Sequence, residues 1–284
     1  MVKCFKIVND NKNGYFAINY IEVDKSNLDH VTKLLPKGGY TTFRTYEKTK
    51  VLRFDHHIYR IINSGKLLNI DISINNIKIR EILKNIISVF SDQERNYRIR
   101  IVIDFEVEIG QIYLLIENLV PIPESSYTKG IACITNNKVV RENPRAKLTN
   151  FIYDTEYYRE NRKQDVNEIL LVDNQNFIIE GMTSNFFAVK NGIIYTSNQN
   201  ILMGITRELV VSVIKKNELK INYNPIRLDD ISSINEAFIT SSSRGVLPVI
   251  KINNITINGG FVGEYTKIIS NDTQQKITSE IEEL

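Results

Sequence analysis

Apolar side chains in the first 118 residues follow both the two-residue period of strands and the wider spacing of helices. Six segments have strand-like character, namely 3–8, 15–20, 40–46, 51–54, 97–104 and 111–118. Asn13-Gly14 predicts a hairpin turn between the first two. Helices are predicted over 55–64, with Asp55 as N-cap and Gly65 as the stop, and over 76–91. We therefore expect a sheet with helices in this part of the chain.

Residues 126–284 contain many short apolar runs and few helical patterns. Strands are predicted over 129–135, 138–141, 168–172, 177–180, 185–189, 193–196, 237–241 and 247–251. Helices are predicted over 154–163, 206–217 and 261–279. This proportion of strands predicts a barrel-like or sandwich sheet, so the whole chain is expected to be of the α+β class.

The segment 118–126, Asn-Leu-Val-Pro-Ile-Pro-Glu-Ser-Ser, holds two prolines and two serines and is the most linker-like part of the sequence. Domain boundaries fall in segments of this composition. We expect a small α+β domain over 1–118, a linker over 119–125 and a larger domain over 126–284.

Composition narrows the class of protein. The chain has 284 residues, of which 42% are hydrophobic and 24% charged, as in a globular protein with a core. Its net charge of +3 gives no reason to expect nucleic acid as a partner. No apolar run approaches the roughly 20 residues of a membrane helix, and the amino terminus lacks a signal-peptide pattern. Cys4 and Cys133 lack metal-ligand spacing, so we expect reduced thiols, no metal site and a cytoplasmic location.

Residues 177–207 combine an isolated carboxylate with a helix start. Glu180 ends the apolar run Phe177-Ile-Ile and precedes Gly181. Farther along, Gly204-Ile-Thr-Arg207 opens the helix predicted over 206–217. An acid suits a basic nitrogen, and the free N–H groups of a helix start suit a phosphate. Together they would suit the two ends of one ligand.

Lys147 lies in Asn143-Pro-Arg-Ala-Lys-Leu-Thr-Asn150, between predicted elements. With 36 basic residues in the chain, a solvated loop lysine is the default interpretation. The order of the segments changes this view, because Glu180, the helix start and the hydroxyl cluster Thr240-Ser-Ser-Ser243 follow it.

The adjacent His56 and His57 have no accompanying ligand cluster and point in different directions on a helix, so we interpret His56 as a surface residue and His57 as structural.

Five motifs in this order resemble the class IV aminotransferases, the fold-type IV pyridoxal-phosphate (PLP) enzymes. They are Gly39-Tyr-Thr-Thr-Phe-Arg44 with Asp55-His-His-Ile-Tyr-Arg60, Lys147-x-x-Asn150, Glu180-Gly-x-x-Ser-Asn-Phe-Phe187, Leu202-x-Gly-Ile-Thr-Arg207 and Thr240-Ser-Ser-Ser-x-x-x-x-Pro248. The match runs from about residue 38 to 250. The resemblance implies a two-domain enzyme with its cofactor in the cleft between the domains, and a homodimer.

The resemblance also implies a role for individual residues. Lys147 would form the Schiff base with PLP and carry the proton between the substrate Cα and C4′. Glu180 would keep the pyridine nitrogen protonated. The remaining cofactor-binding residues would be Arg60, Ser241 and Ser242 on the phosphate, Gly204, Ile205 and Thr206 at the helix start, and Leu202 against the ring.

The substrate side is less defined by the resemblance. Branched-chain and D-amino-acid aminotransferases usually carry an acid after the aromatic residue of the first motif, whereas Thr41 follows Tyr40 here. Arg98 and Arg100 alternate on one predicted strand and share a face, although solvated arginines are the simpler interpretation. The expected substrate-binding residues are Tyr40, Thr42, Arg44, Arg98 and Ser243.

The expected activity is amino-group transfer between an amino acid, with branched-chain amino acids among the candidates, and a 2-oxo acid. Two alternatives remain. The Thr41-Thr42 pair resembles the aminodeoxychorismate lyase branch, which releases pyruvate from aminodeoxychorismate. A non-catalytic binding protein of the same fold is the third interpretation, and the presence of Lys147 and Glu180 argues against it.

Overall fold

The computed structural model describes residues 1–10, 14–23, 27–90 and 96–284. The chain forms two compact units, each made of discontinuous segments. The first unit comprises Met1–Val120, Ala146–Tyr153 and Glu280–Leu284, and the second comprises Pro121–Arg145 and Asp154–Ser279. The domain limits expected from the sequence stay a prediction.

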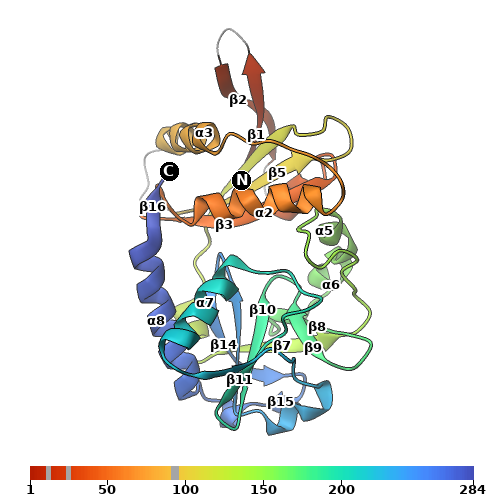
Figure 1. Cartoon of the computed structure of the whole chain (residues 1–284), viewed down its shortest axis with the longest axis vertical. Helices are drawn as coiled ribbons and strands as arrows, with labels where there is room; N and C mark the ends of the chain where they lie inside the picture. Colours follow the sequence, from red (N-terminus) through yellow and green to blue (C-terminus); the bar gives the residue numbers. More distant parts are fainter. Residues whose placement is uncertain (11–13, 24–26, 91–95) are drawn as a thin grey trace. The chain divides into compact units, whose positions relative to one another are not determined.

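The first unit is built on an antiparallel sheet in the order β16-β4-β3-β5-β6-β1-β2 (Figure 1). Its strands are β1 (Val2–Asp10), β2 (Gly14–Val23), β3 (Gly38–Tyr46), β4 (Lys50–Leu52), β5 (Tyr97–Asp104), β6 (Ile112–Asn118) and β16 (Ile281–Glu283). Its helices are α1 (Leu28–Thr32), α2 (Phe54–Lys66), α3 (Asn76–Val89) and α5 (Asn150–Asp154, of which Asp154 belongs to the second unit). The predicted turn residue Asn13 lies outside the described residues.

Alternating side chains of this sheet supply two cores, one on each face. Phe43 and Ile99 pack with Ile58 of α2 and Leu83 of α3. On the opposite face a second cluster joins the sheet to α1 and to the residues after Lys147; it contains Val2, Cys4, Leu28, Val31, Leu35, Tyr40, Val102, Tyr113, Leu115 and Ile152. The sheet is thus buried on both sides, and Figure 1 shows α2 running along β3.

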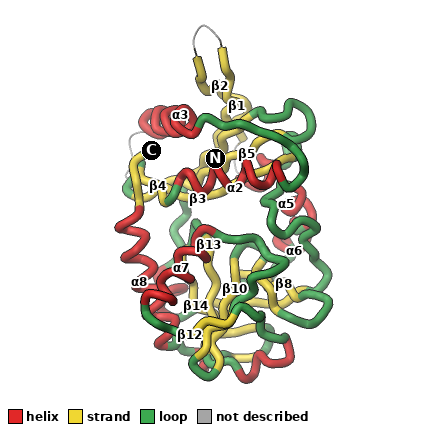
Figure 2. The backbone as a smooth tube through the Cα atoms, in the orientation of Figure 1, coloured by secondary structure: helices red, strands yellow, loops and turns green. Residues whose placement is uncertain are grey.

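The second unit contains a sheet that closes on itself. Its strands are β7 (Ile131–Asn136), β8 (Glu168–Val172), β9 (Ile178–Gly181), β10 (Asn185–Lys190), β11 (Ile193–Tyr195), β12 (Lys220–Asn222), β13 (Glu236–Ser241), β14 (Gly245–Ile252) and β15 (Ile255–Thr256). β10, β13, β14, β7, β8 and β9 follow one another in the sheet, and β9 pairs back to β10 through Glu180 and Asn185. These strands therefore form a closed ring of paired neighbours, which confirms the barrel-like sheet and the α+β class. Figure 2 labels β8, β10, β13 and β14 of this ring.

The helices of the second unit are α4 (Glu124–Thr128), α6 (Glu156–Glu160), α7 (Ile205–Lys216), α8 (Glu264–Glu280, of which Glu280 belongs to the first unit) and the 3-10 turns η1 (Leu228–Ser233) and η2 (Asn258–Gly260).

Neighbouring residues of β10 face opposite sides of the ring. Phe186 lies in one cluster with Leu170 and Ile239, whereas Phe187 stacks on Phe238 at 4.8 Å beneath α7 and α8. This packing holds α7 against the barrel through Val210 and Ile214.

Three local predictions were wrong. Helix α2 begins at Phe54 with Arg53 as N-cap, because the Arg53 carbonyl accepts the N–H groups of His56 and His57; Asp55 lies in the first turn. Gly65 lies inside this helix, where its missing Cβ allows the Ile70 carbonyl to approach closely. No strand forms over 138–141, because Asn136 Oδ1 accepts the N–H groups of Lys138 and Val139 in a turn.

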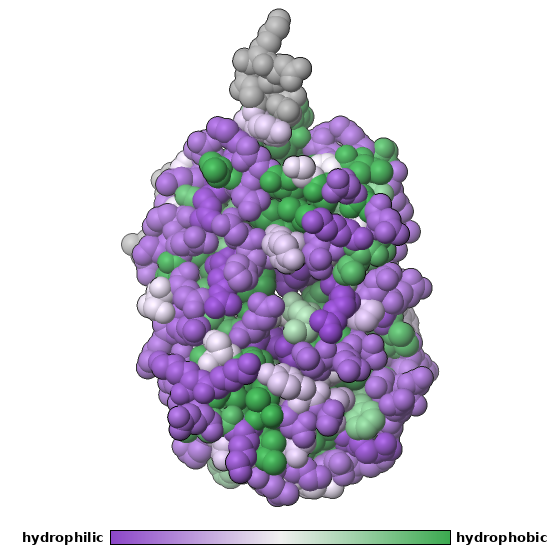
Figure 3. Space-filling model, viewed as in Figure 1, coloured by the Kyte–Doolittle hydropathy of each residue, from purple (hydrophilic) through white to green (hydrophobic). Residues whose placement is uncertain are grey.

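No helix among the described residues is long and apolar enough to cross a membrane. The face of the molecule drawn in Figure 3 carries mainly hydrophilic side chains, with smaller hydrophobic areas between them.

Candidate active site

The backbone of Lys147 is attached to β3, the strand that carries the Gly39–Arg44 motif in the first unit. Tyr40 N–H donates to the Lys147 carbonyl at 2.9 Å, and Leu148 forms a bridge with Gly39. A Cβ on Gly39 would meet the ring of Phe105, so glycine is needed here for close packing. The lysine is therefore held on a strand-like segment rather than on a free loop.

The Lys147 side chain is half-buried and lies near aromatic and hydroxyl groups. Its Nζ is 4.6 Å from the centroid of the Tyr40 ring. Its backbone N–H donates to Ser64 Oγ at 3.0 Å, and Ser64 Oγ donates to the Arg60 carbonyl on α2. The Lys147 backbone is thus linked to Tyr40 directly and to the Arg60 carbonyl through Ser64, all within one unit.

The carboxylate of Glu180 lies at the end of β9 in the second unit and is almost fully buried. Arg141 Nε is 3.1 Å from its Oε1, and Leu202 N–H donates to its Oε2 at 3.1 Å. A buried carboxylate with these donors is stabilised in its charged form. Such a group can hold a proton on a basic ring nitrogen.

The turn before α7 is tied to the same carboxylate. Asn185 Nδ2 donates to the Leu202 carbonyl at 2.8 Å and lies 3.5 Å from Glu180 Oε2. A Cβ on Gly204 would overlap Asn185 Oδ1, so the turn requires glycine. The acid and the helix start predicted to serve one ligand are therefore joined by hydrogen bonds.

The amino end of α7 has the properties of an anion site. No side chain caps this end of the helix, whose first N–H groups have no partner within the helix itself. The Thr206 hydroxyl is buried and has no hydrogen-bond partner among the described residues. An orphaned hydroxyl beside the positive end of a helix dipole fits a phosphate group.

The serine cluster lies at the turn from β13 to β14, where Ser241 faces Gly245. Arg244 Nε donates to Ser241 Oγ at 3.0 Å, and Arg244 Nη2 lies 2.7 Å from Glu168 Oε2. Ser242 and Ser243 are half-buried in this turn. The Thr240 hydroxyl is buried, and no partner for it occurs within the described parts of the chain.

Glu168 is a fully buried acid that organises this turn. Burial alone would raise its pKa, but the charge of Arg244 and hydrogen bonds from Thr183, Arg244 and the Ile169 N–H lower the pKa below its usual value. Glu168 therefore stays ionised at neutral pH and holds Arg244 in place.

The expected substrate-binding arginines differ in their surroundings. Arg98 pairs with Glu117 at 3.0 Å, and Arg44 lies over the Tyr46 ring. Arg100 is only 3% exposed and pairs with Asp29 at 2.7 Å, so its interpretation as a solvated residue was wrong. Its Nε also donates to Thr42 Oγ1 at 3.0 Å, which was not foreseen because it depends on the register of β3 and β5.

Two further residues were missed by the sequence reasoning. Arg141 was placed in a strand that does not form, and nothing in the local pattern connected it with Glu180. Asn185 was part of a quoted motif, and its position directly opposite Glu180 follows only from the β9–β10 pairing. His57 is buried and His56 exposed, as predicted.

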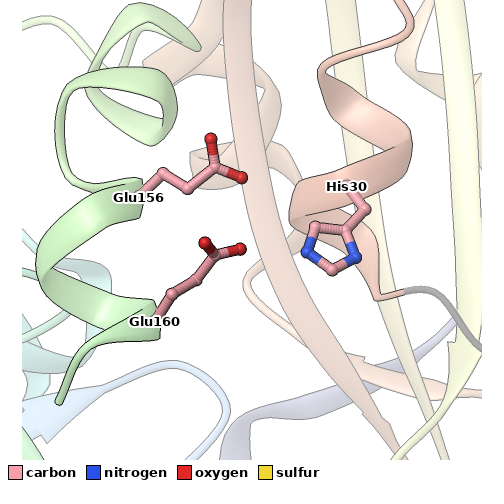
Figure 4. Close-up of side chains that lie close together, drawn as sticks. All are labelled: His30, Glu156 and Glu160. Carbon is pink, nitrogen blue, oxygen red and sulfur yellow. The ribbon is translucent and has the colours of Figure 1, made fainter.

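Side chains with potential metal ligands are drawn in Figure 4. Glu156 and Glu160 extend from α6, one turn apart, and His30 extends from α1. The glutamates belong to the second unit and the histidine to the first, and no metal site is assigned to them.

Comparison with known proteins decides the family. Residues 38–252 match the model of the family described as Amino-transferase class IV, which is most of the chain. The chain belongs to the class IV aminotransferases.

Relatives of this aminotransferase carry names from two branches of the family. It is 29% identical over 273 residues to a Methanocaldococcus jannaschii protein assigned as a branched-chain-amino-acid aminotransferase, covering 90% of this chain and 91% of the relative. It is 25% identical to the D-alanine aminotransferase of Bacillus licheniformis, and the match covers 86% of this chain and 88% of the relative.

Solved structures show the same fold. The branched-chain aminotransferase of Thermoproteus uzoniensis with norvaline superimposes with a TM-score of 0.76 at 19% identity, covering 99% of this chain and 99% of the other. The branched-chain amino acid aminotransferase of Escherichia coli superimposes with a TM-score of 0.75 at 19% identity, covering 94% of this chain and 93% of the other. The fold is therefore that of fold-type IV.

Class IV aminotransferases use PLP, so this aminotransferase is a PLP-dependent enzyme. A branched-chain amino acid aminotransferase of the same fold has been solved with pyridoxamine 5′-phosphate. The residues of this chain fit the cofactor chemically. The buried Glu180 suits the ring nitrogen, the buried Thr206 hydroxyl at the uncapped start of α7 suits the phosphate, and Lys147 supplies an amine.

Proposed function

We propose that this aminotransferase moves amino groups between branched-chain amino acids and 2-oxo acids, with Lys147 and Glu180 as its catalytic residues. The observation that carries the site assignment is the hydrogen bond from Leu202 N–H to Glu180 Oε2, at 3.1 Å. It joins the acid that suits the ring nitrogen to the turn that opens α7. The names of the M. jannaschii relative and of the solved structures support the substrate class.

When bound, PLP supplies an aldehyde that exchanges amino groups and a protonated ring that withdraws electrons. Lys147 Nζ would hold the cofactor and then carry the proton from the substrate Cα to the cofactor C4′, and it would carry the proton in the opposite direction in the second half-reaction. Glu180 keeps the proton on the ring nitrogen, because its own charge is stabilised by Arg141 and the Leu202 N–H.

Other residues would hold the phosphate and the ring of the cofactor. Arg60 would bind the phosphate with its guanidinium. The start of α7 and serine hydroxyls would donate hydrogen bonds to the phosphate, and Leu202 would pack on the ring. The residues of that set are Leu202, Gly204, Ile205, Thr206, Ser241 and Ser242.

Substrate selection is proposed for Tyr40, Thr42, Arg44, Arg98 and Ser243. We favour transfer over the lyase reaction because the relatives described above are all named aminotransferases.

We also propose a cytoplasmic homodimer, as the family resemblance implies. Sedimentation should then give a mass of twice the 32.8 kDa chain, and a monomeric mass would refute it.

The lysine assignment is tested by borohydride reduction followed by peptide mass analysis. Wild-type protein should carry reduced cofactor on Lys147, and the exposed-lysine control Lys138→Ala should behave like wild type. Lys147→Ala should carry none. Reduced cofactor elsewhere in the wild-type protein would show that Lys147 is the wrong residue.

The reaction and substrate are tested with a panel of amino donors and 2-oxo acids that includes aminodeoxychorismate. Turnover of leucine, isoleucine or valine with 2-oxoglutarate is expected. Turnover of D-alanine without turnover of any branched-chain amino acid would show that the enzyme is instead a D-alanine aminotransferase, as the B. licheniformis relative is named. Pyruvate release from aminodeoxychorismate without an acceptor would establish the lyase alternative.

A further inference from the structure

Three polar side chains form a chain of hydrogen bonds inside the first unit. Arg60 Nη2 donates to Thr41 Oγ1 at 2.7 Å, and Thr41 Oγ1 lies 2.7 Å from His57 Nδ1. His57 and Arg60 are three residues apart on α2 and so lie on one face of the helix. That face packs on β3, from which Thr41 projects.

The bond between Arg60 and Thr41 has a fixed direction. A guanidinium group can only donate, so the Thr41 oxygen accepts from Arg60. The Thr41 oxygen has two lone pairs, so the tautomer of His57 sets the direction of the second bond. With the imidazole proton on Nε2 the Thr41 hydroxyl donates to Nδ1, and with the proton on Nδ1 the ring donates to Thr41. In both cases His57 holds the Thr41 hydroxyl in place.

The surroundings of His57 favour the neutral ring. Its side chain is buried, with its ring 4.9 Å from the Phe43 ring. Burial lowers its pKa well below the usual value, and the positive charges of Arg60, Lys147 and His56 act in the same direction. The ring beside Thr41 is thus neutral at neutral pH and adds no positive charge next to Arg60.

We propose that Thr41 and His57 are positioning residues that orient the Arg60 guanidinium toward the phosphate of the cofactor. This inference rests on the proposed role of Arg60. A neutral hydroxyl fixes the direction of the guanidinium without neutralising its charge, whereas a carboxylate at the same position would form a competing ion pair. Arg60 then meets the phosphate in one orientation and with its full charge.

A purely structural role for the same hydrogen bonds predicts a different result. If they only join α2 to β3, their loss should weaken every ligand of the site equally. If they act through Arg60, their loss should weaken ligands that carry the phosphate and spare those that lack it. PLP and pyridoxal, which differ only in the phosphate, separate the two cases.

The test measures the dissociation constants of PLP and pyridoxal for apoprotein variants. Thr41→Val keeps the side-chain shape and removes the hydroxyl; it should weaken PLP about tenfold and change pyridoxal less than twofold. Thr41→Ser should restore PLP binding, and Thr41→Glu should weaken it further than Thr41→Val does.

Thr45→Val is the matched control. Thr45 lies on the same strand and the same face, is equally buried, and accepts a hydrogen bond from the Tyr97 N–H at 2.8 Å. Its loss should leave the ratio of the two dissociation constants unchanged. In an Arg60→Met background, Thr41→Val should change PLP binding less than twofold, because the residue it orients is gone.

Equal weakening of both ligands by Thr41→Val, or an undiminished effect in the Arg60→Met background, would overturn the proposal. Should Thr41→Val not fold, Thr41→Ala takes its place in the same comparison of PLP with pyridoxal, and equal weakening of both ligands overturns the proposal there too. Failure of this inference is distinct from failure of the proposed function. If borohydride fixes cofactor on Lys147 but the ligand ratio is unchanged, only the orienting role is wrong.

Discussion

Arg141 Nε lies 3.1 Å from Glu180 Oε1, and both side chains are almost completely buried, at 7% and 2% exposure. A buried ion pair of this kind is sensitive to the loss of either charge, because the remaining partner stays uncompensated. Arg141 therefore stabilises the negative charge of Glu180 in the protein alone, without a ligand. This makes the carboxylate a suitable permanent partner for a protonated ring nitrogen.

Glu180→Gln should keep bound cofactor but lower turnover about a hundredfold, because a neutral amide does not hold a proton on the ring nitrogen. Cofactor content by absorbance and steady-state turnover measure the two effects separately. Glu208→Gln, an exposed acid on α7, is the control and should keep full turnover. Unchanged turnover in Glu180→Gln would remove its catalytic role.

Arg244→Met should lower the free energy of unfolding by about 3 kcal/mol, because it leaves the buried Glu168 charge without its partner. Urea unfolding at pH 7 measures the loss. The double variant with Glu168→Gln should recover part of it, since the uncompensated charge is then absent. Because the pKa of Glu168 is lower in the folded protein than its usual value of 4.5, the wild-type protein has the larger free energy of unfolding above about pH 4.5. This difference is lost as the pH falls and Glu168 becomes protonated.

His57 should make stability fall in mildly acidic solution. Its folded-state pKa is well below the usual value of 6.5, first because of burial and then because of nearby positive charges. Below about pH 6.5 the unfolded chain binds a proton that the native state does not, so up to about 1.4 kcal/mol is lost per pH unit. Between pH 7.5 and 5.5, His57→Phe should lose less stability than wild type in urea unfolding. An equal loss in both proteins would contradict this.

Cys4 and Cys133 should be unreactive in the native protein. Both are buried, and burial raises the pKa of Cys4 to about 12 and also raises that of Cys133. Because only the thiolate reacts, Ellman's reagent at pH 8 should detect almost no thiol until urea is added, and two thiols afterwards. Rapid labelling of either cysteine without urea would show that its segment opens readily.

Regular elements with strong patterns could be predicted from the sequence. β8 was predicted at its observed limits, and α7 was predicted to within one residue. Short strands were predicted unevenly. β4 and β11 fall at the strands predicted over 51–54 and 193–196, whereas β12, β15 and β16 were missed, because two or three residues do not show a period of their own. The helix predicted over 154–163 is reduced to α6, and it is separated from α5 at Thr155.

The motifs indicated which residue types the site contains but not how they are connected. The pairing of Glu180 with Asn185 depends on closure of the barrel, and the contact of Thr42 with Arg100 depends on sheet register. The link from Arg60 through Thr41 to His57 depends on how α2 packs against β3. Each is a tertiary relationship, which local patterns do not encode.

The discontinuity of the first unit has a consequence for its biosynthesis. β16 pairs with β4, and the Leu284 side chain is buried in the core that contains Phe43 and Phe54. A ribosome making this chain therefore releases the edge strand of the sheet that supports Lys147 only after it has made residues 1–280. A nascent chain halted after residue 153 would contain Lys147 but would still lack that strand, so the lysine would be synthesised long before its supporting sheet is complete.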